Sequence, residues 1–175
     1  CGAIATINSA SLMLGNRLSV MAIQRFYSYK YYSLMSSSFC EGSSVQNESG
    51  ICVGMNWAVL RQLSLSSYVD YAYFPWPRYL ITGTSRTFDM QHTATWTKGS
   101  WDITARYRLK TWNRDNSETH SLDRVTQHRA RLAITNSNKL WLSRTQCDVS
   151  LYNQNGTSKG YMISQQAGIR TKTLQ

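Results

Sequence analysis

Residues 88–110 read FDMQHTATWTKGSWDITARYRLK and alternate apolar with polar side chains on both sides of Lys98-Gly99. A period of two over this length is typical of β-strands, and a glycine at the second turn position favours a type I′ turn. A hairpin folded about Lys98-Gly99 would pair Trp96 with Trp101, Ala94 with Ile103, Met90 with Tyr107, Gln91 with Arg106 and Asp89 with Arg108. One face is then apolar and the other is polar with matched charges, which a slip of one residue would destroy.

The same alternation recurs along the chain. It predicts about nine strands, at residues 3–14, 17–28, 50–58, 62–74, 86–97, 100–111, 125–136, 139–152 and 160–172. Tight connections are expected at Gly15-Asn16, 59–61, 98–99 and 136–138, and long ones at about 29–49, 75–85, 112–124 and 153–159. Short turns at one end of long strands and long polar loops at the other are what a bacterial outer-membrane β-barrel requires. The predicted fold is therefore all-β, an antiparallel up-and-down meander that forms part of such a barrel.

A soluble β-sandwich also alternates and is the alternative fold. Length favours the barrel, because a tilted strand of about 9–11 residues crosses a bilayer, whereas strands in soluble proteins average about 5–6 residues. Aromatic side chains near the predicted strand ends would form an interfacial girdle. They are Trp57, Trp96, Trp101, Trp112, Trp141 and Tyr73.

The chain of 175 residues is basic, with 19 Lys and Arg against 9 Asp and Glu and a formal net charge of +10. The basic side chains of the polar face are Arg106, Arg108, Lys110, Arg129, Arg131 and Arg170. A lipid-facing arginine at mid-bilayer costs about 2–4 kcal/mol, so we expect these residues to line the lumen, with Asp89 and Asp102 as partners. The alternation places His92 on the apolar face, so we expect it near a membrane interface or hydrogen-bonded within the barrel wall.

A basic lumen favours the binding or translocation of a polyanion. The alternative is a plug, in which the arginines pair with acidic groups and contribute structure alone. Two other hypotheses stay open: a structural or assembly component whose loops bind other envelope proteins, and a soluble β-sandwich or jelly roll that binds glycans through exposed tyrosines. The favoured interpretation places the chain in the bacterial outer membrane, with membrane lipid and nucleic acid or another polyanion as partners and no cofactor.

Aromatic and basic residues also cluster in the predicted loops. The candidate loop ligands are Tyr27, Tyr29, Tyr31, Tyr32, Trp76 and Arg78. The tyrosines, beside Arg25 and Lys30, could stack bases or sugars while the cations hold phosphate, but an interfacial aromatic belt explains them as well. Residues 74–79, FPWPRY, favour a rigid loop folded over the barrel mouth, because the two prolines fix its backbone.

No pattern indicates an enzyme or a metal centre. His92, His120 and His128 have no recognisable serine nucleophile motif nearby. The four cysteines show no CxxC or Cys/His metal spacing. Cys40 and Cys52 flank a polar loop, and both a disulfide between them and free thiols stay open. Oxygens for Ca²⁺ could come from Glu41, Gln46, Asn47 and Glu48, although the Asp-x-Asp-Gly pattern is missing.

The chain begins at Cys1, without a signal peptide, and ends within a strand-like run. No apolar run approaches the length of a membrane helix. We therefore expect residues 1–175 to be a single β-barrel segment of a longer chain.

Two regions carry a resemblance to a known family. The first contains RFYSYKYYSL (25–34), FCEG (39–42) and VQNESGI (45–51), and the second contains YVDY (68–71) and FPWPRY (74–79). Together they resemble the carboxy-terminal β-barrel region of Bacteroidota helix-hairpin-helix proteins, in which a small DNA-binding-type module precedes a predicted outer-membrane barrel. The likeness covers most of residues 16–170. It implies an outer-membrane barrel and, by analogy alone, a role in DNA uptake, because this chain lacks the helix-hairpin-helix module itself.

Overall fold

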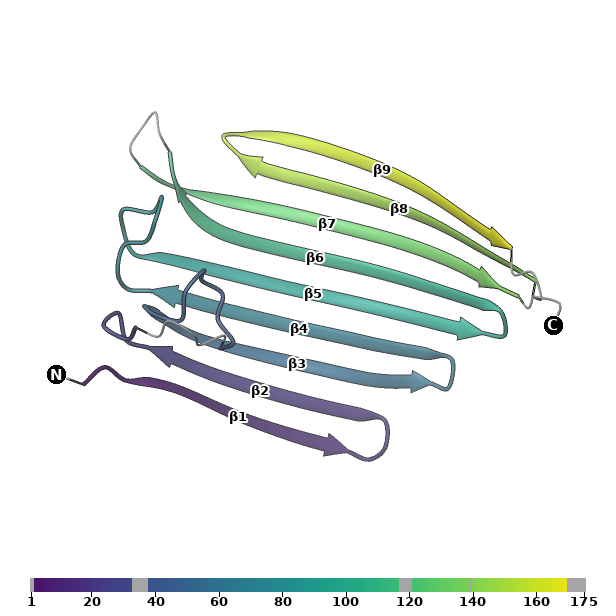
Figure 1. The fold of residues 1–175 in the computed structure, drawn as a ribbon, viewed down its shortest axis with the longest axis horizontal. Helices are drawn as coiled ribbons and strands as arrows, with labels where there is room; N and C mark the ends of the chain where they lie inside the picture. The colour runs from purple at the N-terminus through teal and green to yellow at the C-terminus, as the bar shows by residue number, and fades with distance from the viewer. Residues whose placement is uncertain (1, 33–37, 117–120, 139, 170–175) are drawn as a thin grey trace, which may run out of the picture.

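The computed structural model describes residues 2–32, 38–116, 121–138 and 140–169. These residues form nine strands in one antiparallel sheet, whose order follows the chain from the first strand to the ninth (Figure 1). The strands are β1 (Ala5–Leu14), β2 (Leu18–Tyr27), β3 (Glu48–Leu60), β4 (Leu63–Phe74), β5 (Ser85–Lys98), β6 (Trp101–Asp115), β7 (Leu122–Ser137), β8 (Trp141–Gln154) and β9 (Gly156–Ile169). The predicted all-β meander is therefore confirmed. Within the described ranges, no helix is long and apolar enough to cross a membrane.

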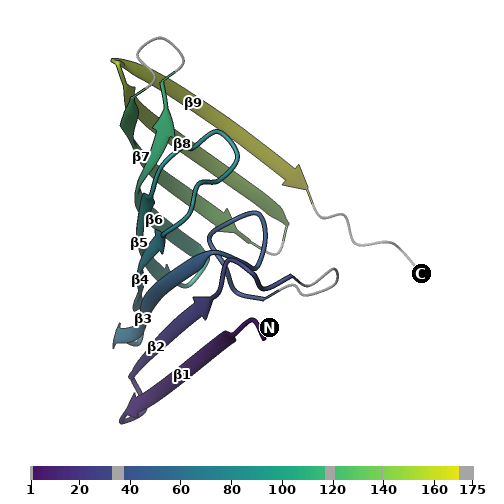
Figure 2. The ribbon, with the colours of Figure 1, turned by 90° about the vertical axis from the view of Figure 1, so that its left-hand side faces the viewer.

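The sheet is a single curved layer. Figure 2 shows it bending around the side on which the described parts of the connections 28–47 and 75–84 lie. We call this side the concave face and the opposite side the convex face. Among the described residues, β1 pairs only with β2 and β9 only with β8, so the sheet is not closed into a barrel. The β-sandwich alternative is wrong, because all nine strands belong to one sheet.

The β5–β6 hairpin turns one residue later than the sequence pattern predicts. Lys98 pairs with Trp101, so the two turn residues are Gly99 and Ser100. Gly99 has a φ of 60° at the first turn position, which type II′ turns give to glycine, so the predicted type I′ turn about Lys98-Gly99 is wrong. The actual pairs are Trp96 with Ile103, Ala94 with Ala105, Met90 with Leu109, Gln91 with Arg108 and Asp89 with Lys110. Each pair is displaced by two residues, which is also the side-chain period of a strand, so the predicted faces are unchanged.

The connections alternate in length as predicted, with one exception. Two or three residues separate β1 from β2, β3 from β4, β5 from β6 and β7 from β8, and longer connections join β2 to β3, β4 to β5 and β6 to β7, at 28–47, 75–84 and 116–121. The predicted long loop at 153–159 is wrong, because only Asn155 separates β8 from β9. Its sequence, NQNGTSK, has the polar composition of a loop, yet the two strands stay paired to its end. The predicted loop at 112–124 is also too long, because β6 and β7 extend into it.

The two faces differ in polarity. The register places a set of exposed apolar side chains on the convex face: Ile51, Val53, Val69, Tyr71, Tyr107, Leu132, Val149 and Ile163. The buried polar side chains of the strands gather mainly on the concave face, among them Arg25, Glu48, Asp70, Ser85, Thr87 and Asp89. No second layer covers the convex face in the part of the chain that the structure describes. A large exposed apolar surface of this kind marks a contact with something other than water.

Tryptophans line one end of the convex face. Trp57, Trp96, Trp101 and Trp141 all lie there, beside the tight turns. Tyr73 lies on the same face at the opposite end of β4. Trp112 departs from the prediction, because β6 continues past it and its parity places it on the concave face with Lys110. Its ring lies 6.2 Å from the ring of Tyr152.

His92 and His128 each form a side-chain hydrogen bond to a neighbouring strand of the sheet. His92 lies on the convex face, and its Nδ1 is 2.7 Å from Ser67 Oγ on the neighbouring strand. His128 lies on the same face, with its Nδ1 2.9 Å from the hydroxyl of Tyr107. The prediction that His92 hydrogen-bonds within the wall is confirmed. Each polar ring therefore avoids the cost of an unpaired group on an apolar surface.

Candidate functional site

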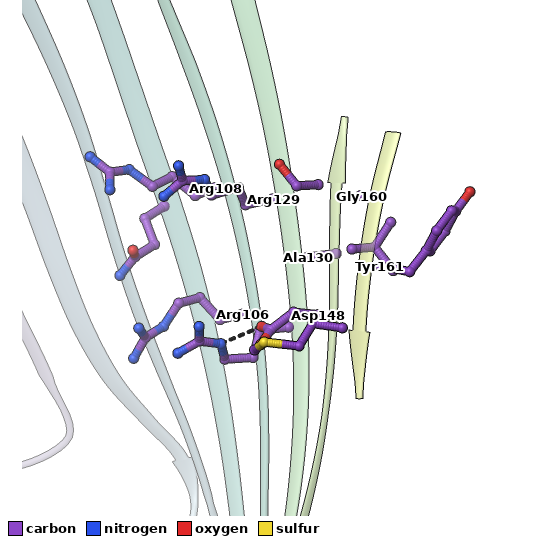
Figure 3. A pocket seen from close by; sticks show the side chains of 12 residues that line it. Arg106, Arg108, Arg129, Ala130, Asp148, Gly160 and Tyr161 are labelled. Atoms are coloured by element: carbon purple, nitrogen blue, oxygen red, sulfur yellow. Dashed lines mark hydrogen bonds and ion pairs between the residues drawn. The ribbon is translucent and has the colours of Figure 1, made fainter. Parts of the chain in front are cut away.

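Four arginines meet on the concave face where β6 and β7 pair. Arg106 lies directly opposite Arg131, and Arg108 lies directly opposite Arg129. All four line a hollow of about 440 Å³, together with Asp148 of β8. Figure 3 shows Arg106, Arg108 and Arg129 extending to the same side of the sheet. Like charges directly opposite each other destabilise a sheet, so this cluster needs nearby negative charge.

Two of the four guanidinium groups have a carboxylate partner. Arg108 binds Asp89 of β5, with Nε 2.9 Å from Oδ1 and Nη2 in contact with Oδ2. Arg131 Nε binds Oδ1 of Asp148. These contacts reach across neighbouring strands on the concave face. Arg108 and Arg131 are therefore held in place by the protein itself.

The other two guanidinium groups lack a carboxylate partner among the described residues. The guanidinium group of Arg106 makes no hydrogen bond or ion pair with any described residue. The side-chain amide of Gln127, in the orientation that satisfies both of its polar atoms, accepts hydrogen bonds from Nε and Nη2 of Arg129 at 3.2 and 3.0 Å. This contact leaves the charge of Arg129 uncompensated. The hollow thus presents two available cations beside two that are already neutralised.

The remaining predicted lumen residues have different surroundings. Lys110 lies on the concave face, as expected, but its Nζ contacts Oε1 of Glu41 in the connection 28–47 and lies 4.0 Å from Asp89 Oδ2. The prediction that Asp102 pairs with the arginines is wrong. Within the described chain Asp102 has no ion pair, and its carboxylate accepts a side-chain hydrogen bond only from Thr104 Oγ1, at 3.4 Å. Asp148, which no sequence pattern indicated, is an arginine partner instead. Arg170 lies outside the described residues.

A second charged cluster, which no sequence pattern indicated, is buried at the loop end of the concave face. Arg25 of β2 has a side chain with 0% exposure, as does Glu48 of β3. Nη1 and Nη2 of Arg25 donate to the two carboxylate oxygens of Asp70 on β4 at 2.7 and 2.9 Å, and Nε contacts Glu48 Oε1. The ring of Phe39 covers the guanidinium, 4.9 Å from its Cζ. Arg25 therefore joins three adjacent strands under the connection 28–47.

Backbone groups of that connection complete the cluster. The N–H groups of Glu41 and Gly42 donate to the carboxylate of Glu48 at 3.0 Å. The hydroxyl of Tyr27 donates to the backbone carbonyl of Phe39 at 2.8 Å. The connection is thus fastened over the concave face by groups from β2 and β3. A carboxylate that accepts several N–H bonds and an arginine has its charge well compensated despite burial.

Arg25 fits only because Gly50 lies opposite it on β3. A Cβ atom at Gly50 would meet the Arg25 guanidinium at 2.7–2.9 Å. We expect Gly50→Ala to lower the free energy of unfolding by about 1–3 kcal/mol, because overpacking displaces the buried guanidinium from its carboxylates. Denaturant titration of both proteins in detergent measures the difference.

Gly54 offers the matched control for this prediction. It lies on the same face of β3, but a Cβ there would meet the flexible side chain of Met21 at 3.4 Å and the backbone oxygen of Ser67 at 3.9 Å, which is an ordinary van der Waals contact. We expect Gly54→Ala to change stability by less than about 0.5 kcal/mol. Equal losses from the two substitutions would mean that the contact with Arg25 is not the cause.

The structure separates the predicted loop residues. Tyr27 is buried and holds the connection 28–47 in place. Tyr29 and Trp76 meet, with ring centroids 4.5 Å apart, and they line a hollow together with Arg78. Tyr31 and Tyr32 do not line this hollow, and Tyr32 is largely exposed. The predicted loop residues therefore form one pair and one neighbouring cation instead of a single tyrosine cluster.

The described cysteines do not form a disulfide bond, and the predicted calcium ligands have other partners. Cys40, Cys52 and Cys147 are free thiols, so the alternative of a Cys40–Cys52 disulfide is not realised. Burial raises the pKa of the Cys40 thiol, and the charge of Glu48 raises it further. Glu41 and Glu48 bind Lys110, Arg25 and backbone N–H groups. Among the described residues, no group of three or more His, Cys, Asp or Glu side chains could hold a metal ion.

Comparisons of the chain with known protein families, with curated protein sequences and with solved structures find no match. The resemblance to helix-hairpin-helix proteins stays a prediction.

Proposed function

We propose that this chain forms part of the wall of a bacterial outer-membrane β-barrel, with its convex face against lipid and its concave face lining an interior that binds polyanions. The observation that supports this most is the polarity of the two faces, with apolar side chains exposed on the convex face and charged side chains buried on the concave face. Folding in water normally buries apolar surface. Lipid on one side and water on the other favour the arrangement seen here.

Strand length and tryptophan placement support the same proposal. The strands are 10–16 residues long, and about 9–11 tilted residues cross a bilayer. The row of tryptophans beside the tight turns matches an aromatic girdle at one membrane interface. In a membrane the backbone groups of β1 and β9 also need partners, because unpaired groups in lipid cost several kcal/mol each. A closed barrel would supply those partners.

The polyanion site is assigned to the hollow between β6, β7 and β8. Its two arginines without carboxylate partners, Arg106 and Arg129, lie on neighbouring strands and diagonal to each other. Guanidinium groups bind phosphate and sulfate through charge-assisted hydrogen bonds, and several such contacts on one polymer add up. The protein has already oriented Arg108 and Arg131 beside them.

Removing the two uncompensated cations tests this assignment. We expect the double variant Arg106→Gln with Arg129→Gln to bind fluorescent heparin at least about tenfold more weakly, because each charged hydrogen bond contributes about 1.5–3 kcal/mol. The slope of affinity against salt concentration should fall as well, because fewer counterions are released. Titrations in detergent micelles at several salt concentrations measure both quantities.

A charge-matched variant separates the hollow from the overall charge of the protein. Arg61→Gln with Arg144→Gln removes the same charge from two exposed positions outside the hollow. This control should bind heparin as the unmodified protein does. Equal weakening in the two double variants would exclude a specific site and leave only the net charge as the cause.

A structural role for the cations is the second candidate. It is favoured by the pairs Arg108–Asp89 and Arg131–Asp148 and by the buried Arg25, all of which are neutralised within the protein.

Reconstitution into planar bilayers distinguishes transport from this role. An anion-selective conductance would support translocation, and a protein that binds heparin without conducting would support binding alone. Single-stranded DNA, which the family resemblance suggests, is tested as a competitor of heparin.

A further inference from the structure

A second hollow of about 500 Å³ lies between the connections 28–47 and 75–84. Asn47 fastens the two connections together, because its side-chain amide donates to the carbonyl oxygen of Trp76 at 2.8 Å and accepts from the Trp76 N–H at 3.0 Å. Asn47 has a φ of 56°, a left-handed conformation that asparagine tolerates better than most residues. The hollow is therefore formed before any ligand arrives, which lowers the entropy cost of binding.

Aromatic side chains form its apolar surface. The rings of Tyr29 and Trp76 lie at an angle of 32°, and these residues are 45% and 51% exposed. Tyr79 beside them is 90% exposed. Three exposed aromatic side chains at one hollow offer flat apolar surfaces with polar edges. Such surfaces suit a ring that has one apolar face.

One cation at this hollow lacks a carboxylate partner. The Arg78 guanidinium lies over the Phe74 ring, with its Cζ 3.3 Å from the centroid, and Nη2 donates to Ser85 Oγ at 3.1 Å. Its Nε is buried and has no hydrogen-bond partner within the described chain. Burial lowers the pKa of Arg78, and the charges of Glu48 and Glu41, which do not contact it, offset this effect only in part. The carboxylates of Glu48 and Glu41 are engaged by Arg25 and Lys110 instead.

We propose that this hollow binds an acidic saccharide, with a sugar ring packed on Tyr29 and Trp76 and its carboxylate, phosphate or sulfate group near Arg78. Ser43, Ser44 and Gln46 line the same hollow and can exchange hydrogen bonds with sugar hydroxyls, which both donate and accept. A nucleic acid fits less well, because the Ser43, Ser44 and Gln46 side chains beside the aromatic pair match a ring that carries several hydroxyl groups, which a nucleobase lacks. A single cation matches one acidic sugar unit. The proposal depends neither on lipid contact nor on the arginines of the concave face.

Binding of oligogalacturonate, a linear polymer of an acidic sugar, tests the proposal, with the neutral maltohexaose for comparison. We expect oligogalacturonate to quench tryptophan fluorescence in the unmodified protein. Trp76→Ala and, independently, Tyr29→Ala should each weaken its binding about tenfold, as expected for loss of a central aromatic contact. Arg78→Gln should abolish the preference for oligogalacturonate over maltohexaose, and Arg78→Lys should restore part of it, because lysine keeps the charge without the planar fork.

Two variants serve as controls, with binding measured by calorimetry. Trp57→Ala removes a tryptophan that is 42% exposed at the opposite end of the sheet, and it should leave binding unchanged. In the Arg106→Gln with Arg129→Gln background, which lacks the two cations of the concave polyanion site, Trp76→Ala and Tyr29→Ala should still weaken oligogalacturonate binding about tenfold, so failure of this proposal and failure of the concave polyanion site are distinguishable. No binding of oligogalacturonate, or binding that Trp76→Ala and Tyr29→Ala leave intact, overturns the proposal. Tighter binding of a single-stranded oligonucleotide that the same variants weaken overturns it in favour of nucleic acid.

Discussion

Replacing Arg25 with methionine is expected to lower the free energy of unfolding by about 3–5 kcal/mol, the largest loss we predict for any single side chain. The substitution keeps most of the volume but leaves the carboxylates of Glu48 and Asp70 buried without their cation. Lysine should rescue little of the loss, because it cannot donate to both oxygens of Asp70 while also reaching Glu48. Denaturant unfolding in lipid vesicles, followed by tryptophan fluorescence, measures the change.

The triple variant Arg25→Met with Glu48→Gln and Asp70→Asn provides the internal control. It removes both stranded charges together with the arginine, so it should be more stable than Arg25→Met alone. Arg144→Met, at an exposed position of the same face, should cost less than about 1 kcal/mol. Limited proteolysis should cut the connection 28–47 faster in Arg25→Met, because Glu48 then holds that connection less firmly. An Arg25→Met protein as stable as the Arg144→Met protein would contradict the structural role of this cluster.

Placing an arginine on the convex face is the second large effect, and it tests contact with lipid. Leu132 lies near the middle of β7 on that face and is 44% exposed. We expect Leu132→Arg to make folding into lipid vesicles less favourable by about 2–4 kcal/mol, because a charge at mid-bilayer loses its hydration. In a protein whose convex face meets water, the same substitution at an exposed position would have little effect.

Ser66 provides the comparison on the concave face. It is an exposed residue of β4 that faces the same side as Asp70. Ser66→Arg should change folding into vesicles by less than about 1 kcal/mol, because water wets this side of a barrel wall. Equal costs for Leu132→Arg and Ser66→Arg would rule out the proposed orientation of the sheet in a membrane. A cost for Leu132→Arg that persists without lipid would indicate that the residue packs against protein.

Sequence periodicity predicted the two faces of the β5–β6 hairpin, but it did not predict the register of that hairpin. Moving the β5–β6 turn from Lys98-Gly99 to Gly99-Ser100 displaces every pair by two residues and leaves the faces unchanged, so alternation alone cannot distinguish the two hairpins. The error has a chemical consequence, because Asp89 lies opposite Lys110 and reaches Arg108 diagonally. The faces of Arg106, Arg108, Arg129 and Arg131 were nonetheless predicted correctly.

The Arg25 cluster was missed because its members are far apart in the sequence and carry no shared motif. Arg25 belongs to a hairpin whose faces are both mixed in polarity, so its parity gave no signal. The one available hint was Gly50 and Gly54 on the same face of β3, since small residues leave room for a long side chain from a neighbouring strand. The loop at 153–159 was wrong for a related reason, because polar residues that continue a strand cannot be distinguished from a loop by composition.

The separation of the Arg25 contacts along the chain predicts an order of events during folding. Its carboxylate partners lie 23 and 45 residues further along the chain, on the next two strands. Contacts at such separations form late, because the intervening chain must first lose its freedom. β2, β3 and β4 must therefore be aligned before the guanidinium is neutralised and the connection 28–47 can settle over it. We therefore expect the connection 28–47 to reach its final position only after β2, β3 and β4 are paired in the correct register.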